Sequence, residues 1–273
     1  MNASLRSFGK GVGIAAVLVF TLLPVWMMVS TSLNGRANAG SRSLWPEQLT
    51  FGNFVGLFRD GGFGTYLLNS VIVATGTVLI SGMLALLAAV AVARFRFRFR
   101  TSVLVMVLIV QMVPLEALVI PLFIQAKSLA LLNSLTGLIV VYLAFSLPFA
   151  IWTLRGFVAA VPKELEEAAY LDGCSWWRMF WSVLFPLVAP GLVATSVFSF
   201  ITAWNEFVFA LTFMKDESGY TVAVGLKSFF GQHLTDWGSV MAASTVITIP
   251  VLVFFVLAQK RLTDGLVAGA VKG

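Results

Sequence analysis

The sequence has one cysteine, one histidine and few charged residues. Only 11% of its 273 residues are charged, against about a quarter in soluble globular domains. A single cysteine excludes an internal disulfide, and one histidine with one cysteine makes a metal site of nitrogen and sulfur ligands improbable. The sequence has no paired histidines and no Ser-His-Asp set that would indicate an enzyme active site. No Gly-x-x-x-x-Gly-Lys-Ser/Thr motif occurs, so the chain has no P-loop for ATP.

Apolar residues dominate the chain instead. They make up 59% of it, and the mean hydropathy is +0.94. Six stretches are long enough to cross a hydrocarbon core, which takes about 20 apolar residues. They lie near residues 12–31, 66–93, 101–125, 133–155, 187–213 and 238–259. We therefore predict an all-α integral membrane protein with six transmembrane helices in one domain, residues 1–273.

The distribution of positive charge indicates the orientation of these spans. The net charge is +6, and if the N-terminus is cytoplasmic, twelve of the 18 Lys and Arg residues fall in inner segments. This excess predicts that both termini and the segment 157–186 are cytoplasmic. Arginine and phenylalanine alternate from Arg94 to Arg100. We expect this inner turn to contact the lipid bilayer, with arginines at anionic headgroups, rather than nucleic acid.

A polar stretch follows the fourth predicted span. Pro162 precedes Glu164, Glu166 and Glu167, and acids after a proline are typical of the first turn of a helix. Gly173 predicts the end of that helix, because glycine adopts the left-handed conformation easily. A second short helix is predicted from residue 174 to 185, leaving in a new direction.

The spacing in this stretch resembles a known motif. Glu167-Ala168-Ala169 is followed after three residues by Gly173, and after nine more by Val183, one residue and Phe185-Pro186. This resembles the EAA loop of membrane subunits in binding-protein-dependent ABC importers, with Val183 and Phe185 in place of the usual isoleucine and leucine. In that family the loop is a coupling helix that lies in a cleft of an ATPase subunit. The resemblance assigns coupling to Glu164, Glu167, Ala168, Ala169, Asp172, Gly173 and Pro186. The alternative is an amphipathic hairpin that binds nothing.

Two acids fall within predicted spans, Glu116 and Glu206. A carboxylate at that depth should face protein, water or substrate. Trp204 and Asn205 precede Glu206, and this Trp-Asn-Glu-Phe pattern resembles the fifth span of carbohydrate-type permeases. An indole, an amide and a carboxylate suit sugars, so Glu116, Trp204, Asn205 and Glu206 are candidates for the substrate pathway. The alternative is that they join helices through hydrogen bonds.

The resemblance is to the maltose-type (MalG-like) carbohydrate-uptake branch and extends over the whole chain. It implies a type I ABC importer permease fold, with the coupling helix between the fourth and fifth spans, in a prokaryotic cytoplasmic membrane. The implied partners are a second permease subunit, two copies of an ATPase subunit and an extracytoplasmic sugar-binding protein. The chain itself would be no enzyme and bind no cofactor, with ATP and Mg on the ATPase. The alternative is an ion-driven secondary transporter using Glu116 or Glu206, although no internal repeat is visible.

Overall fold

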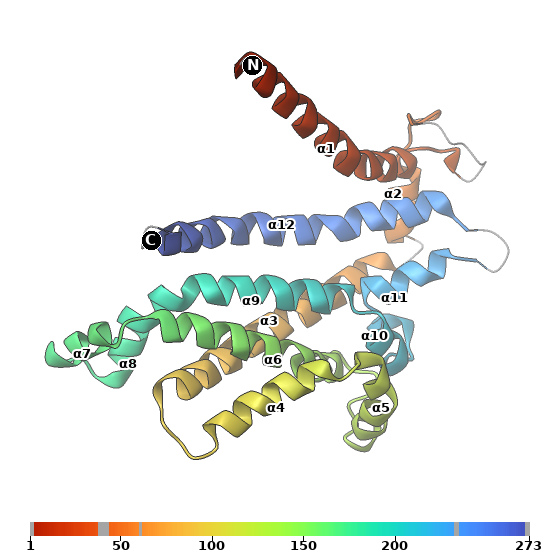
Figure 1. The fold of residues 1–273 in the computed structure, drawn as a ribbon. Helices are drawn as coiled ribbons and strands as arrows, with labels where there is room; N and C mark the ends of the chain where they lie inside the picture. The colour runs from red at the N-terminus through yellow and green to blue at the C-terminus, as the bar shows by residue number, and fades with distance from the viewer. Residues whose placement is uncertain (1–2, 38–43, 60–61, 232–234, 271–273) are drawn as a thin grey trace. The chain divides into compact units, whose positions relative to one another are not determined.

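Long helices make up most of the molecule. The computed structural model describes residues 3–37, 44–59, 62–231 and 235–270. The five longest helices in these ranges are α1 (Ala3–Ser32), α3 (Phe63–Arg94), α6 (Leu135–Ala160), α9 (Phe185–Asn205) and α12 (Trp237–Ala270) (Figure 1). Extended pairing among the described residues is limited to two isolated bridges, Asn34 with Leu49 and Phe230 with Thr235.

Shorter elements connect these helices. They are α2 (Gly52–Arg59), α4 (Arg100–Met112), η2 (Leu115–Leu118), α5 (Val119–Ser128), α7 (Lys163–Leu171), α8 (Trp176–Met179), η3 (Phe180–Leu184), α10 (Val208–Phe213), η4 (Glu217–Gly219), α11 (Val222–Leu226) and η5 (Lys227–Phe229). Five helical stretches of the described residues are long and apolar enough to cross a membrane: Lys10–Ser32, Phe63–Arg94, Leu135–Ala160, Trp176–Asn205 and Trp237–Gln259. A sixth results if α4 and the segment Leu115–Ser128 form one broken span.

The third and fifth spans differ from the sequence prediction, because each breaks before its acid. The two halves of the third span meet at an angle of 97°. Pro114 causes this break, since it lacks an N–H and forces the residue before it into an extended conformation. In the fifth span α9 ends at Asn205, and Glu206 is extended. Neither acid therefore lies along a straight helix.

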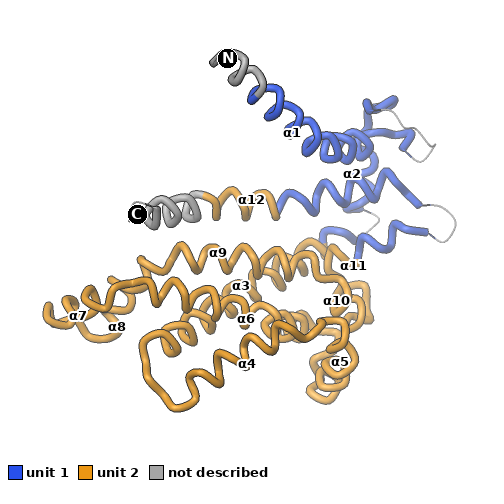
Figure 2. Tube along the Cα trace, in the orientation of Figure 1, with its two compact units in different colours: residues 1–64, 225–250 blue, residues 65–224, 251–273 orange. Residues whose placement is uncertain are grey.

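The described chain forms two compact units, residues 1–64 with 225–250 and residues 65–224 with 251–273 (Figure 2). In the first unit, the segment after α1 folds back on the end of that helix. Trp26 Nε1 and Ser30 Oγ both donate to the carbonyl of Leu44, at 2.9 and 3.0 Å. Asn53 Nδ2 donates to the carbonyl of Ser32 at 2.8 Å. The first two bonds hold the segment at Leu44 against α1, and the third satisfies a carbonyl that the end of that helix would leave without a partner.

In the second unit, one hydrophobic core joins α3, α6 and the elements that follow α6. Small residues of α3, such as Ala85 and Ala89, allow close approach, while Leu154 of α6 and Phe180 of η3 fill the space between. The buried members are Ala85, Leu86, Ala89, Val90, Ala150, Leu154, Val158, Val161, Ala169, Met179, Phe180, Leu184 and Val188. The segment between α6 and α9 is therefore packed against the helices and is not a loose connection.

Candidate functional site

The helix α7 begins and ends as the sequence predicts. Pro162 is its N-cap, and Glu164 and Glu166 lie in its first turn. At its end Gly173 has a φ of +78°, the left-handed region that glycine adopts without strain. The N–H of Gly173 donates to the carbonyl of Tyr170, and that of Cys174 to the carbonyl of Ala169, both at 3.0 Å. This pair of bonds is a Schellman motif, which fixes the direction in which the chain leaves the helix.

The sequence predicts that the helix after Gly173 ends at residue 185, but this helix continues into α9. The Ser175 side chain accepts from the N–H of Arg178 at 3.4 Å and caps α8. The turn η3 is a π-helix, in which the N–H of Phe185 donates to the carbonyl of Phe180. Residues Trp176–Asn205 consequently form one span of 30 residues. The π turn accommodates Pro186, whose missing N–H would interrupt an α-helix.

The residues between α6 and α9 divide into an exposed set and an anchored set. Of the residues assigned to coupling from the sequence, all but Ala169 are exposed: Glu164, Glu167, Ala168, Asp172, Gly173 and Pro186. Ala169 is 7% exposed and belongs to the core. Leu171 is 89% exposed and Trp177 61%, and sequence reasoning missed both. The loop thus presents acidic and apolar side chains together, while its opposite face is packed.

Sequence reasoning also missed an ion pair beneath this loop. Arg94, the last residue of α3, donates through Nε to Glu166 Oε1 at 2.6 Å. Its Nη2 donates to the carbonyl of Val161 at 2.8 Å. The two charged side chains are only 10% and 12% exposed. The sequence indicated Glu166 only as an acid of the first turn, and no local pattern relates it to an arginine 72 residues earlier.

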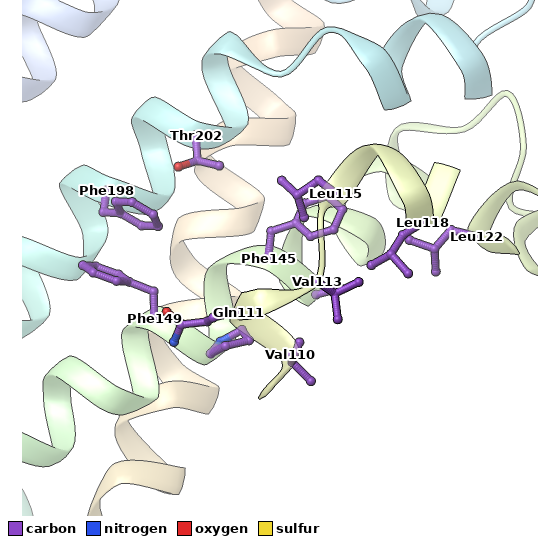
Figure 3. Close-up of a pocket in the computed structure, with 12 residues that line it drawn as sticks. Val110, Gln111, Val113, Leu115, Leu118, Leu122, Phe145, Phe149, Phe198 and Thr202 are labelled. Carbon is purple, nitrogen blue, oxygen red and sulfur yellow. The ribbon is translucent and has the colours of Figure 1, made fainter. Parts of the chain in front are cut away.

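A cavity of about 270 Å³ lies in the second unit beside the break in the third span (Figure 3). The rings of Phe149 and Phe198 lie against each other in its wall, with centroids 3.9 Å apart. Gln111 and Thr202 contribute the polar side chains of its lining. Its lining residues are Val110, Gln111, Val113, Leu115, Leu118, Leu122, Ala144, Phe145, Pro148, Phe149, Phe198 and Thr202. The cavity therefore combines aromatic faces with two groups able to form hydrogen bonds.

The four pathway candidates from the sequence do not line this cavity. Glu206 accepts from the hydroxyl of Tyr142 at 2.7 Å and from the N–H groups of Phe209 and Ala210 at 2.8 and 3.0 Å. Its carboxylate therefore caps α10 and ties it to α6. Glu116 lies exposed in η2, one residue after Leu115 of the cavity.

Trp204 and Asn205, the two residues before Glu206, have different contacts from those of its carboxylate. Trp204 is 2% exposed and stacks on Phe200 at 5.4 Å, so its ring is covered in this conformation. Asn205 is exposed, and its amide donates to the carbonyl of Ile201 at 2.9 Å. Both side chains thus make contacts within α9 itself.

Residues 81–267 match the protein family described as "Binding-protein-dependent transport system inner membrane component". The chain belongs to this family. The match includes the exposed loop, the ion pair and the cavity. The permease is thus a multi-pass membrane protein of a transport system, and its acidic and apolar loop lies in the segment whose spacing resembles the EAA motif.

Curated relatives and solved structures agree with this assignment. The permease is 42% identical over 95% of its length to the diacetylchitobiose uptake system permease protein DasC of Streptomyces coelicolor, covering 96% of that protein. It is 38% identical to the trehalose transport system permease protein SugB of Mycobacterium tuberculosis, covering 94% of each chain. A chain of a bacterial ABC transporter involved in alginate import has a TM-score of 0.80 at 22% identity, covering 95% of the permease and 98% of that chain. The permease therefore has the type I ABC importer fold.

Proposed function

We propose that this permease is a transmembrane subunit of an ATP-driven, binding-protein-dependent importer of sugars or oligosaccharides. Relatives over nearly the full length are permeases for diacetylchitobiose and for trehalose, and both names describe small saccharides. In the proposed assembly the chain pairs with a second permease subunit and two copies of an ATPase subunit. An extracytoplasmic sugar-binding protein delivers the substrate. Both termini are cytoplasmic, and ATP and Mg bind the ATPase, so the permease needs no cofactor of its own.

The loop after α6 carries this proposal. Its outer face presents Glu164, Glu167 and Asp172 beside Leu171, and Leu171 is 89% exposed. An apolar side chain this exposed, with acids around it, fits a cleft in a partner protein better than it fits water. Its inner face is fixed by Ala169 and the Schellman motif. We assign this loop as the coupling helix that docks into the ATPase.

The cavity is the site that we propose for the substrate pathway. Sugar rings have apolar faces that pack on aromatic side chains, here Phe149 and Phe198, and hydroxyls that need partners such as Gln111 and Thr202. Glu116 is exposed next to this lining and remains a candidate pathway residue. Glu206 is satisfied by three hydrogen bonds. We therefore propose a structural role for it and for its neighbours Trp204 and Asn205.

In the proposed mechanism the ATPase dimer closes when it binds ATP and draws the two coupling helices together. The helices of the permease then move from an inward-open to an outward-open arrangement, and the binding protein releases its sugar into the pathway. The permease contributes a binding loop, rigid helices and a lined pathway, and it takes no part in the chemistry of hydrolysis.

Purification of the tagged chain from its native membrane tests this function, with the captured proteins identified by mass spectrometry. We expect a P-loop ATPase and a second permease of the same family to be recovered with it. Glu167→Lys should reduce ATPase recovery, because it reverses a charge on the docking face, whereas Arg98→Glu reverses an exposed charge outside the loop and should not. Recovery of the chain alone, with uptake that collapses under an ionophore while ATP is abundant, would instead indicate an ion-driven transporter.

A further inference from the structure

We propose that Arg94 is a positioning residue that couples movement of the loop after α6 to α3. This inference rests on the proposed function, because it presumes that an ATPase moves the loop. Arg94 lies outside the stretch 167–186 that resembles the EAA motif, and its contacts with Val161 and Glu166, just before that stretch, depend on the fold. The proposal adds one specific mechanical connection between the docking surface and a membrane-spanning helix.

The guanidinium of Arg94 joins the ends of three helices. Arg94 is the last residue of α3, Val161 is the C-cap of α6, and Glu166 lies in the first turn of α7. Its Nε and Nη2 atoms make separate bonds of 2.6 Å to Glu166 and 2.8 Å to Val161. The carbonyl of Val161 would otherwise be one of the unpaired acceptors at the end of a helix. One side chain therefore fixes both α6 and α7 against α3.

The chemistry of this contact requires arginine. The guanidinium is planar and holds its N–H donors in a fixed fork, so the two acceptors must keep a fixed relation to each other. A lysine could reach Glu166 or Val161 but has no rigid fork to hold both. By contrast, Arg96 and Arg98 of the same turn are exposed and have no described partner. Arg94 is thus distinguished from its neighbours by its contacts as well as by its burial.

The position of Glu166 on α7 links this contact to the docking face. Glu166 points inward to Arg94, while Glu164 and Glu167 on the same helix are exposed. Val161 and Ala169, on either side of Glu166 in sequence, belong to the core that also contains Val90 of α3. A force on the exposed acids therefore reaches α3 through a charge-assisted bond set in packed surroundings, which is short and strong.

The experiment uses the complete assembly of both permeases, the ATPase and the binding protein, reconstituted in liposomes. Sugar uptake and ATP hydrolysis are measured together for wild type, Arg94→Gln, Arg94→Lys, Glu166→Gln, the exchange Arg94→Glu with Glu166→Arg, and the control Arg96→Gln. Recovery of the ATPase and the midpoint of thermal unfolding are recorded for each assembly. If wild type shows no ATP-dependent uptake, the proposed function has failed before any variant is compared.

We expect Arg94→Gln and Glu166→Gln to hydrolyse ATP but to transport roughly three- to thirty-fold less sugar per ATP, with normal ATPase recovery. Arg94→Lys should lie between these variants and wild type. The exchange should recover part of the ratio, because it restores the ion pair but not the bond to Val161. Arg96→Gln should match wild type. The proposal is overturned if Arg94→Gln transports as much sugar per ATP as wild type. It is also overturned if this ratio falls only in proportion to the loss of assembly, and the exchange restores neither the ratio nor the assembly.

Discussion

The carboxylate of Glu206, in a predicted span, is hydrogen-bonded by other groups of the same protein. The sequence identified it as an acid needing a partner, and left open whether that partner was substrate or protein. In the structure Tyr142 and two backbone N–H groups of α10 supply three hydrogen bonds. The sequence could not show this, because Tyr142 is 64 residues away and no proline or glycine indicates that the helix ends after Asn205.

Replacement of Glu206 should therefore affect stability before it affects transport. Glu206→Ala leaves the N–H groups of Phe209 and Ala210 without acceptors in a buried position, at a cost of about 1–3 kcal/mol. Tyr142→Phe removes a single bond and should cost about 1 kcal/mol. The midpoint of thermal unfolding in detergent, compared with that of the wild type, measures both. Normal stability of Glu206→Ala with loss of uptake would instead return Glu206 to the pathway.

The helices that carry the loop are held by close packing between α6 and α9. Gly191 of α9 lies against the ring of Phe157 of α6, and a Cβ at residue 191 would be 2.4 Å from that ring. Two prolines act differently on these helices: the chain bends at Pro114, whereas a π turn keeps it helical before Pro186. Composition indicates where a proline weakens a helix, but the surrounding packing decides which way the backbone responds.

This packing predicts opposite outcomes for two glycine substitutions. Gly191→Ala should destabilise the protein by about 1–3 kcal/mol, because the added methyl group must displace the Phe157 ring. Gly156→Ala is the matched control, since a Cβ there meets nothing within 4 Å and alanine favours a helix over glycine. Thermal unfolding of the two variants checks the difference. Equal midpoints would mean that α6 and α9 separate easily at this level.

For the molecule as a whole, the sequence predicted the class of fold better than it predicted the contacts between residues. Apolar length sufficed to predict a helical membrane protein, because it depends on local composition, and the resemblance of the loop spacing to the EAA motif indicated the ABC importer type. The exposed Leu171 and the bond between Arg94 and Glu166 were not predictable. Both depend on which face of α7 packs on the core, and that is decided by residues of α3 and α6 far away in sequence.

The orientation in the membrane can be tested by modification of single cysteines. The excess of Lys and Arg in the inner segments predicts that the turn after α3 is cytoplasmic and that the segment after α10 is outside. Arg98 and Lys215 are exposed and represent these two sides. In a Cys174→Ala background, we expect a membrane-impermeant maleimide to modify Lys215→Cys in cells with an intact inner membrane. Arg98→Cys should react only when that membrane is opened. The reverse pattern would place the loop after α6 on the side without ATP, and the coupling role proposed for that loop would then be wrong.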